Sequence, residues 1–222
     1  MNLKAVLFDL DGTLLDTAPD FYTVVNTLRE EESLSPLADE KIRASVSNGA
    51  RALVGMAFQL ERDAPEFDRL HNRLLELYSA NLAVRTRTFP GIDKCLAFLA
   101  AKNIPWGIVT NKSHAYTRPI LEAMQFNPPP LSIVCPEDVN NTKPDAEPLL
   151  LACKQMGCEA NEAIYIGDHR RDIDCGKNAG SITVAAAYGY VDAEDHATRW
   201  QADHLAETAH ELEVIIQNYL SE

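Results

Sequence analysis

Positive charge is scarce in this chain of 222 residues, which has 20 Lys and Arg against 33 Asp and Glu and a net charge of −13. No long basic run offsets this deficit. Nucleic acids and anionic membrane surfaces are therefore excluded as expected partners, because both are bound through clustered cations. A small anionic ligand would need a local positive site within an otherwise acidic protein.

Long apolar runs and paired cysteines are also missing. No run approaches the roughly 20 residues that a membrane-spanning helix needs. Met1–Lys4 leads directly into a short apolar stretch rather than into a signal peptide. Its 5 cysteines are scattered without the paired spacing of a zinc site. These features predict a cytoplasmic protein with buried, reduced thiols.

The most informative stretch that is present is the apolar run Ala5–Phe8, which is followed by Asp9, Asp11 and Gly12. Such a run is typical of a strand buried on both faces of a parallel sheet, where ligands sit at the carboxyl ends of the strands. Two carboxylates so close together need a cation, and Mg²⁺ prefers oxygen ligands completed by phosphate and water. A strand that simply ends in a polar turn is the competing interpretation.

Later segments place further polar side chains at predicted strand ends or beside a proline: Thr110–Asn111, Lys143, and Asp168 with Asp172. Each segment has an ordinary explanation as a helix cap or a solvated surface charge. Together they offer a hydroxyl, a cation and metal carboxylates to accompany an aspartate nucleophile. Phosphoryl transfer through an aspartyl intermediate requires this combination.

Candidate core strands alternate with helical stretches along most of the chain: 5–8, 104–109, 131–134, 163–166 and 183–187. This alternation predicts an α/β fold with a Rossmann-like parallel sheet of about five strands and helices on both faces. Apolar residues at helical spacing predict a final helix over residues 205–220.

The first connection is far longer than the dozen or so residues that a crossover needs. Residues 17–85 carry apolar stripes at helical spacing and predict an inserted all-helical domain. We therefore expect residues 1–16 and 86–222 to form an α/β catalytic core, with residues 17–85 as a helical cap over its active site. Pro90 and Gly91 mark the return to the core.

The ordered motifs resemble those of the haloacid dehalogenase superfamily of phosphotransferases. Four stretches carry the resemblance: Asp9–Thr13, Thr110–Asn111, Lys143–Pro144, and Gly167–Asp168 with Asp172. Residues 16–20, 48–50 and 188–190 look like those of the phosphoglycolate phosphatase branch and its close relatives, the N-acetylmuramic acid 6-phosphate phosphatases. The resemblance implies a Mg²⁺-dependent phosphomonoesterase with a capped α/β core.

The resemblance also implies roles for the motif residues. Asp9 would attack phosphorus and become a transient aspartyl phosphate. Asp11 would protonate the leaving oxygen and later take a proton from water. Thr110 and the backbone amide of Asn111 would hold phosphate oxygens, while Lys143 neutralises their charge.

A Mg²⁺ site is implied in the same way. The carboxylates of Asp9 and Asp168 and the backbone carbonyl of Asp11 would bind the ion. Asp172 would orient a metal-bound water or Lys143, and the sequence leaves direct ligation by Asp172 open. For Lys143 and Asp172, a purely structural ion pair is the alternative.

Substrate choice is expected to lie in the helical cap. Asn48 and Gly49 combine polar donors with a flexible glycine, and Arg51 suits a carboxylate or sugar hydroxyls. Arg43 lies four positions before Ser47 and eight before Arg51, so a continuous helix would place all three near one face. A solvated helix face is the alternative. Phosphoglycolate or a carboxylate-bearing sugar phosphate such as N-acetylmuramic acid 6-phosphate satisfies this hypothesis.

Other functions with similar residues remain open. A phosphosugar mutase of the same superfamily also keeps both aspartates. A phospho-accepting signalling receiver lacks an acid two residues after its phosphorylated aspartate, and a dehalogenase would leave Asp11 and Asp168 unexplained. The expected partner is a small phosphorylated metabolite, and the chain is expected to be a monomer or a homodimer.

Overall fold

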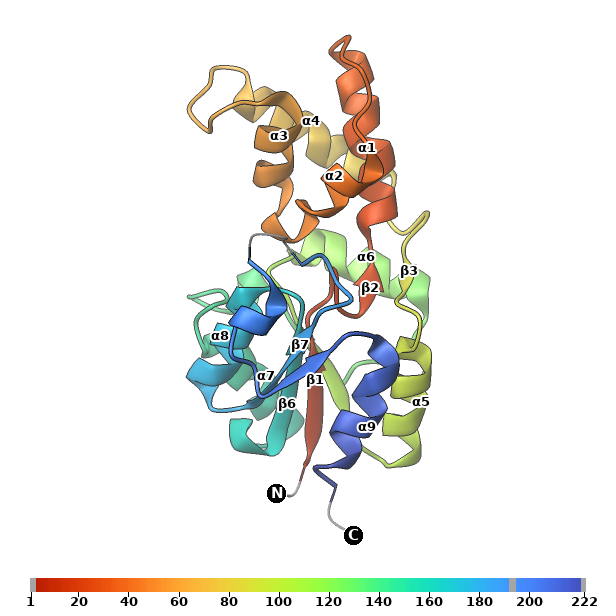
Figure 1. Cartoon of the computed structure of the whole chain (residues 1–222), viewed down its shortest axis with the longest axis vertical. Coiled ribbons are helices and arrows are strands. Elements are labelled where there is room, and N and C mark those ends of the chain that lie inside the picture. Colours follow the sequence, from red (N-terminus) through yellow and green to blue (C-terminus); the bar gives the residue numbers. More distant parts are fainter. Residues whose placement is uncertain (1–2, 192–194, 221–222) are drawn as a thin grey trace.

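The computed structural model describes residues 3–191 and 195–220 and contains a six-stranded parallel sheet of order β5-β4-β1-β6-β7-β8 (Figure 1). Residues 1–2, 192–194 and 221–222 of the predicted core lie outside the described residues. The α/β class is confirmed, with one strand more than expected. The strands are β1 Ala5–Phe8, β4 Trp106–Val109, β5 Ser132–Val134, β6 Ala163–Gly167, β7 Ile182–Ala186 and β8 His204–Ala206.

Strand β1 is buried on both faces, as its apolar run predicts. Val6 and Phe8 belong to the core cluster that includes residues of α5 and α9, whereas Ala5 and Leu7 pack on the other face with α7 and α8. Side chains alternate between faces along a strand, so helices must cover both sides. The helices of the core have the following bounds: α5 Ile92–Ala101, α6 His114–Met124, α7 Glu147–Met156, α8 Arg170–Ala179 and α9 Leu212–Gln217.

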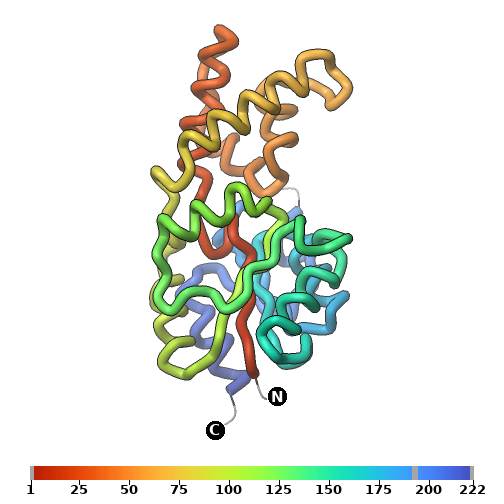
Figure 2. The backbone as a smooth tube through the Cα atoms, turned by 180° about the vertical axis from the view of Figure 1, so that it is seen from behind, coloured from red at the N-terminus to blue at the C-terminus, as the bar shows by residue number. Residues whose placement is uncertain are grey.

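The long first connection forms helices that stand above the carboxyl ends of the strands (Figures 1 and 2). We call residues 17–85 the helical insertion. It lies between β2 and β3, which pair as an antiparallel ribbon. That this insertion works as a separate cap stays a prediction. The elements are β2 Leu15–Asp16, α1 Ala18–Glu31, α2 Asp39–Arg43, the 3₁₀ helix η1 Val46–Asn48, α3 Ala50–Phe58, α4 Phe67–Ala80 and β3 Arg87–Thr88.

A buried carboxylate ties the two crossings of the insertion together. Asp20 lies in the first turn of α1 and is 2% exposed. Its oxygens accept hydrogen bonds from the backbone N–H of Arg85 at 2.6 Å and from the hydroxyl of Thr86 at 2.7 Å. The entry and exit of the insertion are therefore held side by side.

The end of the chain differs from expectation. Residues 205–220 do not form one helix, because His204–Ala206 pair with β7 as strand β8 and only Leu212–Gln217 form α9. Apolar spacing in a short segment cannot show that a sheet edge is available to pair with it. The predicted reduced, buried cysteines are confirmed, since all of them are free and buried. No helix in the described part of the chain is long and apolar enough to cross a membrane.

Candidate active site

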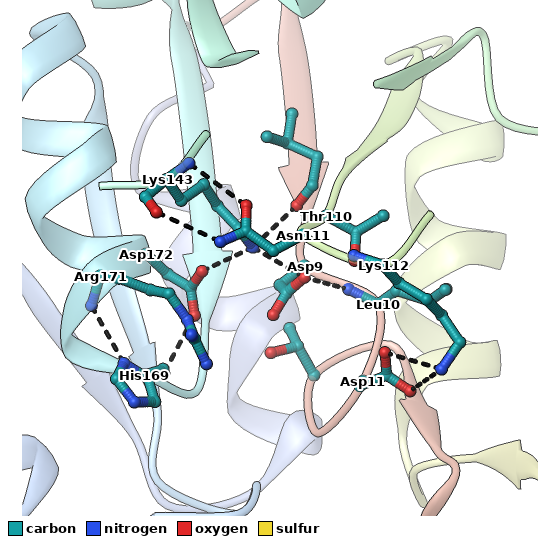
Figure 3. A network of polar contacts seen from close by, with 12 residues as sticks. Asp9, Leu10, Asp11, Thr110, Asn111, Lys112, Lys143, His169, Arg171 and Asp172 are labelled. Atoms are coloured by element: carbon teal, nitrogen blue, oxygen red, sulfur yellow. Dashed lines mark hydrogen bonds and ion pairs between the residues drawn. The ribbon is translucent and has the colours of Figure 1, made fainter. Parts of the chain in front are cut away.

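The strand-end residues converge at the carboxyl edge of the sheet (Figure 3). Asp9 and Asp11 follow β1, Thr110 follows β4, and Asp168 follows β6. Strands β4 and β6 flank β1 on its two sides. Three adjacent parallel strands therefore deliver side chains that are far apart in the sequence to one place.

Asp9 is a buried carboxylate of which one oxygen accepts hydrogen bonds and the other accepts none from the described residues. Its Oδ1 accepts hydrogen bonds from the backbone N–H of Leu10 at 2.7 Å and from Nζ of Lys143 at 2.8 Å. Its Oδ2 has no hydrogen-bond partner within residues 3–191 and 195–220, and Asp9 lines a cavity. Burial raises the pKa of Asp9 from 3.8 to about 6, against the lowering effect of Lys143.

Lys143 is buried between two carboxylates. Its Nζ lies 2.8 Å from Oδ1 of Asp9 and 2.7 Å from Oδ1 of Asp172. The same ammonium donates to the carbonyl of Val109 and the hydroxyl of Tyr165, each at 3.1 Å. Burial alone would lower the pKa of Lys143, but Asp172 and Asp9 outweigh burial and raise it. A permanent positive charge therefore sits beside Asp9.

Asp172 and Asn111 hold Lys143 in place. The second oxygen of Asp172 accepts a hydrogen bond from the backbone N–H of His169 at 3.0 Å, so both of its oxygens are engaged. The side chain of Asn111 exchanges two hydrogen bonds of 3.2 Å with the backbone of Lys143. Of the roles that the sequence leaves open for Asp172, this geometry matches orientation of Lys143. For Asn111, only the backbone amide is left to meet a ligand.

Asp168 is 1% exposed, and both of its oxygens accept hydrogen bonds. Oδ1 accepts from the hydroxyl of Thr13 at 3.1 Å. Oδ2 accepts from the backbone N–H of Tyr190 and from the hydroxyl of Ser47, both at 2.9 Å. Because Ser47 belongs to the helical insertion, the insertion touches this carboxylate directly.

The carboxylates of Asp9, Asp168 and Asp172 fit a divalent cation. One oxygen atom from each carboxylate lies within 4.8 Å of those from the other two. In the described chain, Lys143 is the one cation in ion-pair contact with them. Burial, reinforced by the neighbouring carboxylates, raises the pKa of Asp168 to about 7. A cation would relieve this repulsion, and an all-oxygen donor set suits Mg²⁺ better than a softer metal.

Asp11 forms a second ion pair at the edge of the site. Its Oδ1 accepts a hydrogen bond from Nζ of Lys112 at 3.0 Å (Figure 3). The same oxygen accepts a hydrogen bond from the hydroxyl of Thr17 at 2.5 Å. The Lys112 ammonium lies 4.7 Å from the ring centre of Tyr78 and 5.5 Å from that of Phe21. Both rings belong to the helical insertion, which therefore covers this ion pair.

A cavity of about 380 Å³ lies between the strand ends and the insertion. Asp9 and Thr110 line its core side, and Asn48, Gly49 and Tyr78 line its insertion side. Cavities of this size are typical of small-molecule sites. The cavity thus extends from the insertion to Asp9.

The structure does not bring the two predicted cap arginines to this cavity. Arg43 pairs with Asp16 at 2.9 Å, and Arg51 lies 3.4 Å from the exposed Asp68. The two arginines do not share a helix face, because α2 ends at Arg43 and Gly49, with a φ of +85°, redirects the chain before α3. This placement does not support a carboxylate-binding role for either arginine.

Two residues that line the cavity were missed in the sequence, Lys112 and Arg171, whereas Ser47 belongs to the predicted cap segment. The guanidinium of Arg171 donates to the backbone carbonyl of Ser47, which links α8 to the insertion. A single lysine or arginine is usually a solvated surface charge, so the residue type alone does not indicate that it lines a functional site. The only available signal was position, because Lys112 directly follows Asn111 and Arg171 directly precedes Asp172.

Gly12 lets the chain turn beside Asp168. It has a φ of +82°, and an added Cβ would lie 2.0 Å from Oδ2 of Asp168. Gly12→Ala should therefore displace this carboxylate and weaken Mg²⁺ binding by about 10- to 100-fold, as loss of support for a metal ligand does elsewhere. Titration calorimetry with Mg²⁺ measures this affinity.

Gly180→Ala is the matched control, since Gly180 has a φ of +81° but nothing lies within 4 Å of its added Cβ. Both variants pay the cost of a left-handed residue, about 1–2 kcal/mol. Only Gly12→Ala should change Mg²⁺ affinity. Equal Mg²⁺ affinities in the two variants would show that contact with Asp168 is not why residue 12 is a glycine.

Comparison with known proteins extends these observations over nearly the whole chain. A family model described as haloacid dehalogenase-like hydrolase matches residues 6–186. N-acetylmuramic acid 6-phosphate phosphatases of Pseudomonas aeruginosa and Pseudomonas putida are 43% and 40% identical to this chain, over 96% and 99% of it and 94% and 99% of their own lengths. A phosphoglycolate phosphatase of Xanthomonas campestris is 36% identical over 94% of each chain.

Solved structures share the fold. A predicted phosphoglycolate phosphatase from Haemophilus somnus superimposes with a TM-score of 0.85 at 24% identity, covering 98% of this chain and 99% of its own. A haloacid dehalogenase-like family hydrolase from Streptococcus pneumoniae gives a TM-score of 0.81 at 21% identity, with 97% and 98% covered. At these identities the likeness concerns the fold alone.

Proposed function

The chain belongs to the haloacid dehalogenase-like hydrolase family and is a phosphoric monoester hydrolase, and we propose that its substrate is a carboxylate-bearing sugar phosphate such as N-acetylmuramic acid 6-phosphate. The family resemblance read from the motifs is confirmed, as is its phosphoglycolate phosphatase-like branch. The expectation of a small phosphorylated substrate agrees with the names of these relatives.

The observation that carries the substrate choice is the cavity beside Asp9. Its volume of about 380 Å³ extends from the nucleophile to Tyr78 and Asn48 of the helical insertion. A two-carbon phosphoglycolate would occupy only the end near Asp9, whereas a sugar ring with its substituents would reach the insertion. The relatives at 43% and 40% identity, named for such a sugar phosphate, support the same choice.

In the proposed reaction, the free Oδ2 of Asp9 attacks phosphorus and forms an aspartyl phosphate. Lys143, fixed 2.8 Å from the other oxygen of Asp9, offsets the negative charge that accumulates there. The hydroxyl of Thr110 and the backbone amide of Asn111, which follow β4 and line the cavity, are proposed to hold phosphate oxygens. Water then cleaves the aspartyl phosphate.

Asp11 is proposed as the acid and base. It protonates the leaving oxygen of the sugar and afterwards takes a proton from the attacking water. Its bonds to Lys112 and to Thr17, the residue before α1, connect this proton transfer to the helical insertion. We propose that residues 17–85 act as a cap that closes over the cavity and excludes bulk water during the reaction.

Mg²⁺ is the proposed cofactor, held by the carboxylates of Asp9 and Asp168 and by the backbone carbonyl of Asp11. The crowding of the Asp9, Asp168 and Asp172 carboxylates supports this proposal, because Lys143 pairs only with Asp9 and Asp172 among the described residues. When bound, the ion supplies positive charge that offsets the phosphate and orients it for in-line attack. Asp172 is proposed to orient Lys143.

The test is phosphate release from a panel of phosphomonoesters. We expect kcat/KM for N-acetylmuramic acid 6-phosphate to exceed that for phosphoglycolate by at least about tenfold, which corresponds to about 1.4 kcal/mol of additional binding to the transition state. A chelator should abolish release, and added Mg²⁺ should restore it. Equal or better turnover of phosphoglycolate would contradict the substrate choice, and return of phosphate to the sugar without release would favour a mutase.

A further inference from the structure

The cations that line the cavity differ in their partners. Within the described residues they are Lys112, Lys143 and Arg171. Lys112 is paired with Asp11, and Lys143 is paired with two carboxylates. Arg171 forms no ion pair with any residue that the structure describes, and its guanidinium donates only to the neutral carbonyl of Ser47. Of these three cations, Arg171 is therefore the one without a carboxylate in ion-pair contact among the described residues.

The position of Arg171 separates it from the phosphate-binding groups. It lies in the first turn of α8, is half-buried, and reaches the insertion at Ser47. In Figure 3 its side chain extends from α8 toward the middle of the network. The reacting phosphate already has Lys143, Thr110 and the proposed metal site. Arg171 is therefore available to a second anionic group of the substrate.

A carboxylate is the anion that this arrangement suits. Guanidinium is planar, always charged, and carries five N–H donors that match the two oxygens of a carboxylate. The single bond to Ser47 leaves donors unused. Because the protein has a net charge of −13, a second anion on the substrate would be repelled unless such a local charge received it.

We propose that Arg171 binds the carboxylate of the substrate and selects sugar phosphates that carry one. This inference rests on the proposed function and identifies the residue that recognises the lactyl carboxylate of an N-acetylmuramic acid 6-phosphate. It assigns to α8 of the core a role that the sequence predicts for Arg43 and Arg51 of the insertion.

The competing interpretation is that Arg171 only fastens the insertion to the core through Ser47. The two roles predict different substrate dependence. A fastening role affects every substrate alike, because it acts on closure of the cavity. A carboxylate-binding role affects only substrates that carry the carboxylate.

The experiment compares N-acetylmuramic acid 6-phosphate with N-acetylglucosamine 6-phosphate, which lacks the lactyl ether that carries the carboxylate and is otherwise the same sugar. Arg171→Gln should lower kcat/KM for the first by about 10- to 100-fold, mainly through KM, since hydrogen bonds to charged groups have this strength. For the second sugar, kcat/KM should change by less than about threefold, within the usual small effect of a surface substitution. Arg171→Lys should give a smaller loss, on the first sugar only, because charge remains without the paired donors.

Arg170→Gln is the matched control. Arg170 is the neighbouring residue on α8, but its guanidinium pairs with Asp195 at 2.5 Å and does not line the cavity. This variant should leave kcat/KM for both sugars unchanged. The melting temperatures of all variants show whether each protein is folded. If Arg171→Gln does not fold, the substrate dependence of Arg171→Lys tests the carboxylate-binding role instead.

The outcomes separate the inference from the function on which it rests. If the unmodified protein shows no preference between the two sugars, the proposed substrate is wrong. If it prefers the carboxylate-bearing sugar and Arg171→Gln keeps that preference, the assignment to Arg171 is overturned. Equal losses on both sugars would also overturn it, in favour of the fastening role.

Discussion

Asp9→Asn should abolish phosphate release while leaving the protein folded. The amide has the shape of the carboxylate but cannot attack phosphorus, and removing a catalytic nucleophile elsewhere costs on the order of 10⁶-fold in turnover. Steady-state phosphate release and a search for a phosphorylated protein by mass spectrometry measure the effect. No phosphoprotein should form in the variant, because the oxygen that would carry the phosphoryl group is gone.

The raised pKa of Asp9 also fixes the direction in which Asp9→Asn changes the stability of the fold. Burial raises the pKa of Asp9 from 3.8 to about 6, so the folded protein disfavours the ionised carboxylate. Without metal, this group therefore lowers stability as pH rises from about 4 to 6, and the loss is complete above that range. Asparagine does not ionise, so Asp9→Asn should melt at a higher temperature than the unmodified protein at pH 8 in metal-free buffer.

Asp93→Asn is the matched control for Asp9→Asn. Asp93 is an exposed aspartate in the first turn of α5 and does not line the cavity. It should keep full turnover and an unchanged melting temperature. Near-normal turnover in folded Asp9→Asn protein would exclude the covalent mechanism and require another nucleophile.

Asp11→Asn should lower turnover by about 10²- to 10⁴-fold, the usual contribution of general acid–base catalysis. The loss should be larger for a sugar phosphate than for an aryl phosphate. An alkoxide leaving group is more basic than a phenolate and depends more on protonation. Rates of the first phosphorylation step, measured by rapid quench on both substrates, report this difference.

Mg²⁺ binding separates the proton-transfer role of Asp11 from a ligand role. The proposed ligand from this residue is its backbone carbonyl, which the substitution keeps. The rise in melting temperature that Mg²⁺ produces should therefore be the same in Asp11→Asn as in the unmodified protein. A lost Mg²⁺ response would mean that the side chain of Asp11 holds the metal, and equal losses on both leaving groups would count against its role as an acid.

The motifs and the order of elements could be predicted from local sequence. The apolar run Ala5–Phe8 predicts a doubly buried strand because side chains alternate between the faces of a sheet, and β1 is that strand. Strand ends in a parallel sheet meet at one edge, so Asp9, Thr110 and Asp168 could be expected together before their contacts were known. Strand β8 could not be predicted, because a three-residue strand depends on β7 offering an edge.

The sequence by itself predicted which residues carry phosphoryl-transfer chemistry, since the proposed nucleophile, acid and metal ligands follow strands at short, local spacings. Only the tertiary structure decided which groups the long arginine side chains contact. Arg43 and Arg51 turn to Asp16 and Asp68, whereas Arg171 reaches the cavity. A flexible arginine side chain has many rotamers, and its direction is set by carboxylates and carbonyls that other segments bring near it in the folded molecule.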